Sequence, residues 1–89
     1  MNIEFKKSFA RDLKKKAHGI KLRSRVKEII HEVDNAESLY EIKNIKKLKA
    51  EGDYYRIRLG DYRIGLKIKD GTVFFVRFLH RNEIYRYFP

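Results

Sequence analysis

The stretch from Tyr54 to Ile64 constrains the fold of this chain more than any other segment. Apolar and polar residues alternate along Tyr54–Leu59, which predicts a β-strand with one buried face and one polar face. The Gly60-Asp61 dipeptide follows as a two-residue turn, and a second alternating run comes after it. A turn of this length pairs Arg58 with Arg63 across the two strands. Because two arginines opposite each other repel, we expect the fold to keep them for an anionic ligand.

The rest of the chain predicts an α+β fold, with an N-terminal short strand and a two-helix hairpin packed on a curved antiparallel sheet. Residues 1–89 are expected to form a single domain with a small core. The elements expected before the central hairpin are a strand at Ile3–Phe5, a helix from a Ser8 cap to about His18, a helix over Lys21–Asn35, a helical turn, and a strand near Lys46–Lys49. The sheet strands are expected at Tyr54–Leu59, Tyr62–Lys69 and Val73–Leu79.

The last strand poses a problem of parity after the Asp70-Gly71 turn. With unbroken alternation, a two-residue turn would carry Arg77 into the core. A three-residue loop with Gly71 as its left-handed residue leaves Arg77 outside and turns three apolar residues inward. These are Phe74, Val76 and Phe78. We therefore expect the three-residue loop.

The charge of the chain is unbalanced, with 22 Lys and Arg against 12 Asp and Glu and a formal net charge of +10. Such a balance favours polyanionic partners, meaning RNA, DNA or an acidic protein. Eleven of the 13 lysines precede Tyr54, mostly on predicted helices, whereas six of the nine arginines follow it. Arginine concentrated on strands indicates forked hydrogen bonding to phosphate or carboxylate groups.

The composition also argues against several classes of protein. The chain has no cysteine, which excludes disulfides and thiolate metal sites and fits a reducing cytosol. Its three isolated histidines have no metal-ligand spacing, and we expect His18 and His31 to be surface residues. No apolar run approaches ~18 residues and no signal peptide is recognisable, so we expect a cytoplasmic protein with no membrane segment. No cofactor and no metal are expected.

The predicted polar face of the sheet and the C-terminal tail carry the candidate site. Strand register places four arginines on that face, namely Arg56, Arg58, Arg63 and Arg77. Gly65 lies opposite Arg56, where we expect an open floor. His80, Arg81 and Tyr85 together suit acid–base chemistry on a phosphodiester, and Lys67 and Arg86 extend the basic surface expected to bind RNA. The rings of Tyr87 and Phe88 are expected to pack on the small core.

Two phrases of the sequence resemble the RelE/ParE superfamily of toxins from bacterial type II toxin–antitoxin systems. They are Tyr55-Arg56-Ile57-Arg58-Leu59-Gly60-Asp61-Tyr62-Arg63 and His80-Arg81-Asn82-Glu83-Ile84-Tyr85. The resemblance covers nearly the whole chain and favours the RelE branch. It implies the RelE-like fold and a ribosome-dependent endonuclease that cuts mRNA codons in the A site. In that reaction the RNA 2′-hydroxyl attacks the neighbouring phosphate without metal, giving a cyclic phosphate and a free 5′-hydroxyl.

The resemblance also implies roles for individual residues. The basic residues of the family fall on Arg56, Arg58, Arg63 and Arg81, and its C-terminal tyrosine falls on Tyr85. Where RelE-like sequences often carry lysine this chain has Arg56, and arginine cannot serve as a general base. His80 and Tyr85 are the remaining candidates, and His80 is preferred because some relatives use a late histidine. Strand parity points His80 toward the core unless the strand ends before it.

Two alternatives stay open, a ParE-like inhibitor of DNA gyrase and an inactive RNA-binding relative. The ParE branch generally lacks the basic catalytic set, so Arg58, Arg63 and Arg81 favour the ribonuclease. Every toxin interpretation implies a cognate antitoxin, acidic or amphipathic, that masks the basic face. The ribosome and its mRNA are the other implied partners, and promoter DNA is expected to be contacted only through the antitoxin complex.

Overall fold

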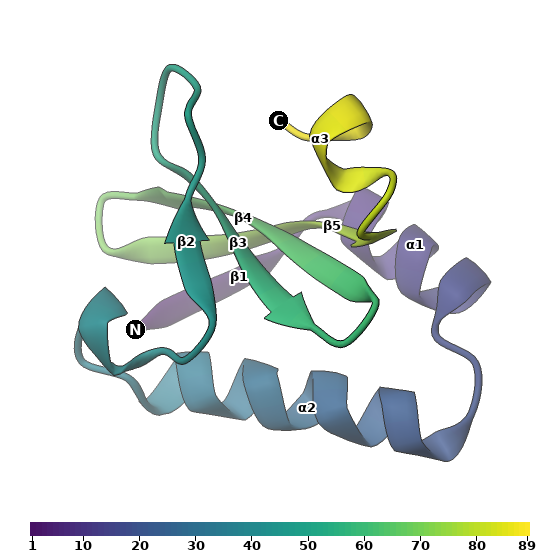
Figure 1. Ribbon diagram of the computed structural model, residues 1–89. Coiled ribbons are helices and arrows are strands. Elements are labelled where there is room, and N and C mark those ends of the chain that lie inside the picture. The colour runs from purple at the N-terminus through teal and green to yellow at the C-terminus, as the bar shows by residue number, and fades with distance from the viewer.

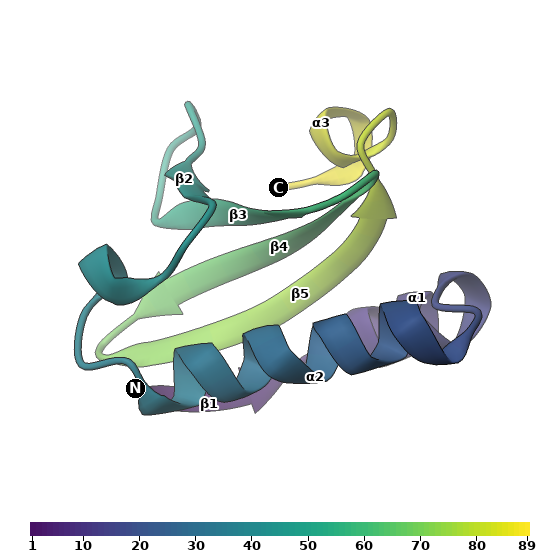
Figure 2. The same ribbon diagram turned by 60° about the horizontal axis from the view of Figure 1, so that its bottom comes forward.

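The computed structural model describes residues 1–89 and contains one five-stranded sheet, with the two longer helices on one side and a short C-terminal helix on the other (Figures 1 and 2). Its elements are β1 (Asn2–Phe5), α1 (Lys7–Lys16), α2 (Ile20–Asn35), a 3-10 turn η1 (Leu39–Glu41), β2 (Ile45–Lys47), β3 (Tyr54–Leu59), β4 (Tyr62–Lys69), β5 (Thr72–His80) and α3 (Ile84–Tyr87). The strand order is β1-β5-β4-β3-β2. The predicted α+β fold is confirmed, and β1 makes the sheet mixed because it runs parallel to β5 at one edge.

Helices α1 and α2 cover one face of the sheet because each presents apolar residues to it. Val26 and Val33 are fully buried in the main core, together with Phe9 from α1. Figure 2 shows α2 running along the sheet on the side opposite α3. No helix of the structure has the length and apolarity needed to cross a bilayer.

The prediction that Ser8 caps α1 is wrong. The helix begins two residues earlier than such a cap implies, at Lys7, and Lys6 occupies the cap position. The Ser8 hydroxyl instead donates a hydrogen bond to the carbonyl of Val76 on β5. The Ser8 hydroxyl therefore bonds to a distant strand and not to the first turn of its own helix. This hydrogen bond connects α1 to the sheet.

The central hairpin has the predicted register. Arg58 pairs with Arg63 and Arg56 pairs with Gly65 across β3 and β4. Gly60 opens the turn with a φ of +57°, a left-handed value that glycine adopts without steric cost. The two-residue turn therefore aligns the arginines of both strands on the face away from the helices.

The predicted register of β5 is wrong. The turn has two residues, since Lys69 pairs with Thr72, and both Asp70 and Gly71 have positive φ. Parity is corrected inside the strand by a β-bulge opposite the Gly65/Leu66 step, where β5 contains one extra residue, Val76. The inward apolar residues are consequently Val73, Phe75 and Phe78. Arg77 stays out of the core because of the bulge and without the longer loop.

Gly65 does not leave an open floor, because the ring of Phe88 lies on it. A Cβ at residue 65 would come within 2.9 Å of that ring. Phe88 is only 4% exposed and belongs to a second small core with Leu48, Leu79 and Ile84. The packing predicted for Phe88 is confirmed, whereas Tyr87 is 52% exposed and does not pack as predicted. The glycine thus provides the seat on which the C-terminal segment docks.

The substitution Gly65→Ala is expected to destabilise the fold by about 1–3 kcal/mol, because the new methyl group must displace the Phe88 ring. Thermal unfolding followed by circular dichroism measures this loss. In the double variant with Phe88→Leu, the combined cost should be smaller than the sum of the two single costs. An unchanged midpoint for Gly65→Ala would show that the ring moves aside freely.

Candidate nucleic-acid interface

Four arginines gather on the face of the sheet opposite α2, and we call them the arginine cluster. Arg56 and Arg58 come from β3, Arg63 from β4, and Arg81 from the turn after β5. The first three share the face because β3 and β4 pair in the register of the two-residue turn. Arg81 is drawn toward the same hairpin by its backbone N–H, which donates to the carbonyl of Asp61.

The electrostatics of Arg63 show that the members of the cluster act on one another. Burial lowers the pKa of the Arg63 guanidinium most, and the positive charge of Arg56 lowers it next. Arg58 and Arg81 add to the lowering, while the hydroxyl of Tyr85 acts to raise this pKa. The cluster therefore carries a positive potential that an anion would relieve.

The hydrogen bonds of the cluster hold it in place and leave donors free. Arg63 donates through one terminal nitrogen to the carbonyls of Gly60 and Tyr62, each at 2.8 Å. Arg56 donates to the carbonyl of Asn44 at 2.8 Å, yet its buried Nε has no partner in the chain. A buried donor without an acceptor is costly, and such groups in native folds call for an explanation.

Carboxylates of the chain leave most of the cluster unpaired. No ion pair engages Arg56, Arg58 or Arg63. Arg81 lies 3.9 Å from Asp61, but both side chains are well exposed, and such pairs contribute little. The arrangement offers several guanidinium groups to an external phosphate.

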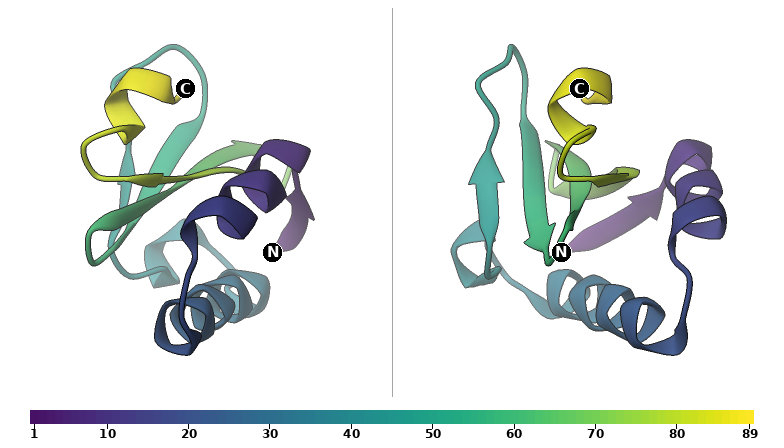
Figure 3. Two further views of the ribbon diagram at one scale, coloured as in Figure 1. Left: turned by 90° about the vertical axis from the view of Figure 1, so that its right-hand side faces the viewer. Right: turned by 45° about the vertical axis from the view of Figure 1, so that its right-hand side comes forward.

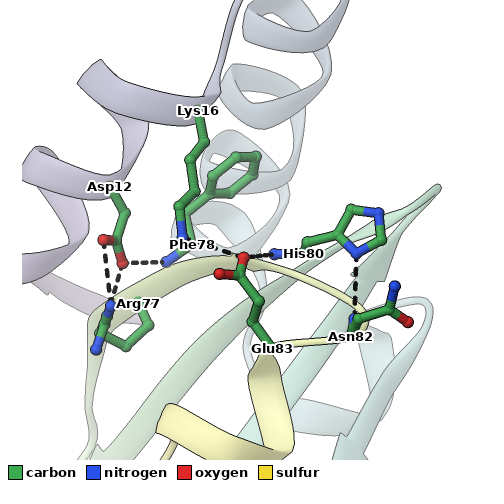
Figure 4. A network of polar contacts seen from close by, with 7 residues as sticks. All are labelled: Asp12, Lys16, Arg77, Phe78, His80, Asn82 and Glu83. Atoms are coloured by element: carbon green, nitrogen blue, oxygen red, sulfur yellow. Dashed lines mark hydrogen bonds and ion pairs between the residues drawn. The ribbon is translucent and has the colours of Figure 1, made fainter.

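Arg77, which we predicted to bind RNA, is held by a carboxylate instead (Figure 4). Its Nε lies 2.7 Å from Oδ2 of Asp12, and a terminal nitrogen lies 3.3 Å from Oδ1. The backbone N–H of Phe78 also donates to Oδ2, at 3.0 Å. Because its charge is already paired, we leave Arg77 out of the proposed RNA contacts.

Asp12 is the partner of Arg77, and the sequence analysis did not identify it. It is 4% exposed and is the only acidic residue of α1, whose other charged residues are basic. A single acidic residue on an otherwise basic helix was the sequence signal that could have indicated a buried ion pair. Its carboxylate satisfies the N–H of Phe78, which lies on β5 beyond the stretch that β1 covers.

His80, our predicted general base, does not join the arginine cluster. Strand β5 continues through it, so alternation directs the ring to the helix-facing side of the sheet. There it packs edge-on against Tyr62, with ring centroids 5.7 Å apart. Its Nδ1 accepts a hydrogen bond from the N–H of Asn82 at 3.2 Å, as Figure 4 shows. Its position gives no support to a role at the phosphate.

Glu83 fixes the turn that leads from β5 to α3. Its Oε1 lies 3.2 Å from Nζ of Lys16 and accepts the N–H of His80 at 3.2 Å (Figure 4). The hydrogen bond from Lys16 is the main cause that lowers the pKa of the Glu83 carboxyl. This contact anchors the C-terminal segment to α1 and so sets the position of the residues that follow.

The remaining predicted residues lie around the cluster. Tyr85 on α3 is 65% exposed and near enough to raise the pKa of Arg63. Lys67 on β4 places its ammonium 5.6 Å from the centre of the Tyr54 ring. Arg86 is exposed on α3 and forms no ion pair. No contact within the chain tests whether Lys67 and Arg86 bind RNA, so their RNA binding stays a prediction.

Lys46 is a further basic residue on this face that the sequence did not reveal. It pairs with Arg56 across β2 and β3, so both side chains emerge on the same side of the sheet. It also lines a cleft of about 440 Å³ between the β2–β3 loop and the C-terminal segment. Finding it required the β2 register, which the irregular spacing of residues 36–48 concealed.

Comparison with known proteins places this geometry in a family. Residues 3–85 match the family model described as the ParE toxin of the type II toxin–antitoxin system parDE. The chain is 48% identical over 90 residues to Toxin RelE3 of Methanocaldococcus jannaschii, with full coverage of both chains.

Solved structures agree with this assignment. The toxin fold of the RelB-RelE antitoxin-toxin complex from Methanococcus jannaschii superposes with a TM-score of 0.78 at 46% identity, covering 96% of this chain and 98% of that one. The RelBE2 toxin-antitoxin complex from Mycobacterium tuberculosis gives a TM-score of 0.69 at 28% identity, covering 90% and 96%. Both confirm the predicted RelE-like fold.

Proposed function

Because this chain belongs to the RelE/ParE toxins of type II toxin–antitoxin systems, we propose that it is a ribosome-dependent endonuclease of messenger RNA. The observation that carries the proposal is the arginine cluster, whose guanidinium groups at Arg56, Arg58 and Arg63 have no internal carboxylate. A codon exposed in the ribosomal A site would supply the missing phosphate. Lysines on α1 and α2 would contact ribosomal RNA.

The proposed reaction is an in-line displacement within the RNA strand. The 2′-oxygen forms a bond to phosphorus while the bond from phosphorus to the 5′-oxygen breaks, leaving a cyclic phosphate and a free 5′-hydroxyl. Negative charge accumulates on the non-bridging oxygens, and Arg56, Arg63 and Arg81 would stabilise it with charged donors. Since the nucleophile is part of the substrate, orientation by these side chains supplies much of the remaining acceleration.

Proton transfer in this scheme falls to Tyr85. Arginine stays protonated, so the cluster can stabilise charge but cannot accept the proton of the 2′-hydroxyl. His80 lies with Tyr62 on the other side of the sheet, whereas the Tyr85 hydroxyl acts on Arg63. We therefore assign the general-base role to Tyr85 in place of His80: the Tyr85 phenolate would accept the proton of the 2′-hydroxyl, and water would protonate the departing 5′-oxygen.

The proposed partner is a cognate antitoxin with an acidic or amphipathic segment. Both solved relatives described above are toxin–antitoxin complexes. A net charge of +10 would speed association with an acidic chain and make it salt-dependent. Covering the arginine cluster would silence the toxin, and promoter DNA would be reached through the antitoxin.

Primer extension on ribosome-bound message tests the proposal. We expect cuts within codons and products ending in a cyclic phosphate, because the attacking group is the 2′-hydroxyl of the RNA itself. Message without ribosomes should be cut far more slowly. Intact message during growth arrest would contradict the proposal.

Inhibition of DNA gyrase is the second candidate, favoured by the family model, which is named for ParE toxins. A gyrase assay with the purified chain separates the two functions. Accumulated cleavage complexes together with intact message would establish the gyrase function in place of the ribonuclease.

A further inference from the structure

The short turn between β5 and α3 lies between two residues of the proposed chemistry. Strand β5 ends at His80 and α3 begins at Ile84, so the turn consists of residues 81–83. Arg81 opens this turn, and Tyr85 follows it on α3. Helix α1 packs against β5, and Figure 3 shows α3 above the sheet at the end where that strand stops. The conformation of the turn therefore sets where both side chains lie relative to the rest of the arginine cluster.

Helix α3 is too short to hold its own direction. It spans only Ile84–Tyr87, and a helix of that length is not stable by itself in water. Ile84 and Phe88 bury their side chains in the second small core, which attaches the inner side of the helix to the sheet. Tyr85 is 65% exposed, so apolar packing does not fix its side chain. The direction of Tyr85 therefore depends on how α3 is joined to β5.

Glu83 makes this joint with both its backbone and its side chain. Its N–H donates to the carbonyl of His80 at 2.8 Å, and its Oε1 accepts the N–H of His80 at 3.2 Å. Its carbonyl accepts the N–H groups of Arg86 and Tyr87, each at 3.0 Å, which begins the hydrogen bonding of α3. One residue thus closes the turn against the strand and starts the helix that carries Tyr85.

Lys16, the last residue of α1, holds the Glu83 carboxylate in this position (Figure 4). Its Nζ lies 3.2 Å from Oε1, the same oxygen that accepts the N–H of His80. The two side chains are 25% and 39% exposed, so the ion pair is partly shielded from solvent. The hydrogen bond from Lys16 lowers the pKa of the Glu83 carboxyl, which keeps the carboxylate ionised at neutral pH. The end of α1 is thereby connected to the joint that directs α3.

We propose that Lys16 and Glu83 are positioning residues for RNA cleavage, which hold α3 so that the Tyr85 hydroxyl lies at the arginine cluster. The inference rests on the proposed ribonuclease function and adds to it two residues that act through Tyr85 and not on the RNA. An ion pair of this exposure contributes little to folding, whereas a misplacement of about 1 Å at a reacting group slows a reaction by about 10²-fold. Loss of the pair should therefore affect the cleavage rate much more than the stability.

Single-turnover cleavage of ribosome-bound message tests the inference, with the maximal rate and the half-saturating toxin concentration measured separately. Lys16→Met should lower the maximal rate by about 10-fold and change the half-saturating concentration by less than about 2-fold, because alignment is lost and binding is kept. Lys16→Arg restores the ion pair and should cleave at nearly the unsubstituted rate. The charge-matched controls Lys69→Met and Glu4→Gln change exposed residues on β4 and β1 and should leave both quantities unchanged.

Two combinations of variants show whether the pair acts as a unit and through Tyr85. Glu83→Gln should slow cleavage about as much as Lys16→Met, and the double variant should be little slower than either, because both changes remove the same ion pair. In Tyr85→Phe, which lacks the proposed base, Lys16→Met should slow cleavage by less than about a further 2-fold. A general loosening of the fold would multiply the two losses instead.

Four outcomes would overturn the inference while the unsubstituted chain still cleaves message. Full rates in Lys16→Met and Glu83→Gln would show that the second small core alone directs α3. A change confined to the half-saturating concentration would assign Lys16 to ribosome binding. Multiplied losses with Tyr85→Phe, or a melting temperature lowered by more than about 8 °C in Lys16→Met, would reduce the pair to a role in folding. If the unsubstituted chain leaves ribosome-bound message intact, the ribonuclease function itself fails, and the positioning role fails with it.

Discussion

The variant Arg63→Ala is expected to cleave ribosome-bound message about 10²–10³-fold more slowly than the unsubstituted chain, the usual cost of removing one charge-stabilising donor. Arg63 is the member of the arginine cluster on which Arg56, Arg58, Arg81 and Tyr85 all act. Two backbone carbonyls hold its side chain, so it presents the remaining donors in a fixed orientation. The initial rate of cleavage, followed by primer extension, measures the effect.

Stability provides the internal control for this prediction. Removing Arg63 also removes the repulsion with Arg58 across the strand pair, so the free energy of unfolding should change by no more than about 0.5 kcal/mol. Arg63→Lys keeps the positive charge but loses the forked hydrogen bonding of the guanidinium group. Its cleavage rate should lie between that of Arg63→Ala and that of the unsubstituted chain. Lys69→Ala, an exposed change at the far end of β4, should cleave normally. Normal cleavage by folded Arg63→Ala would remove the arginine cluster from the mechanism.

The central hairpin could be predicted because its determinants are local. Strict alternation, a glycine in the turn and the two-residue spacing fix which residues face each other, and Arg58 accordingly pairs with Arg63. The apolar stripe of α2 is local in the same sense, since its 3.6-residue period alone selects the buried face. Both the fold class and the shared face of three arginines follow from such short-range patterns.

What the sequence concealed depends on contacts between distant segments. The bulge at Val76 has no composition signal, and it is the bulge that reconciles a two-residue turn with an outward Arg77. The partner of Arg77 lies 65 positions away at Asp12. The role predicted for His80 has no geometric support because the strand extends through it, so that parity directs the ring away from the phosphate site. The open space predicted at Gly65 is filled by the ring of Phe88, because the C-terminal segment packs over the sheet. That contact joins residues far apart in the sequence.

Among the charged residues, Asp12 is the position where a single substitution is expected to cost the most stability. It is buried, and its carboxylate serves both Arg77 and the N–H of Phe78. In Asp12→Ala an arginine that is only one-quarter exposed loses its counter-ion and a buried N–H loses its acceptor. Breaking a buried pair costs about 3–5 kcal/mol, and the partial exposure of Arg77 places our expectation at about 3 kcal/mol. For a domain of this size that lowers the melting temperature by roughly 12–24 °C.

A double-mutant cycle with Arg77→Met attributes this loss to the pair. If Asp12 and Arg77 support each other, the double variant should be more stable than the sum of the single losses predicts, because no unpaired charge is left. Asp34→Ala, at an exposed position of α2, should leave the melting temperature unchanged and serves as the control. The same variants decide the role of Arg77, since folded Arg77→Met should bind RNA as tightly as the unsubstituted chain. Weakened RNA binding with an unchanged melting temperature would instead return Arg77 to the phosphate site and leave Asp12 without its structural role.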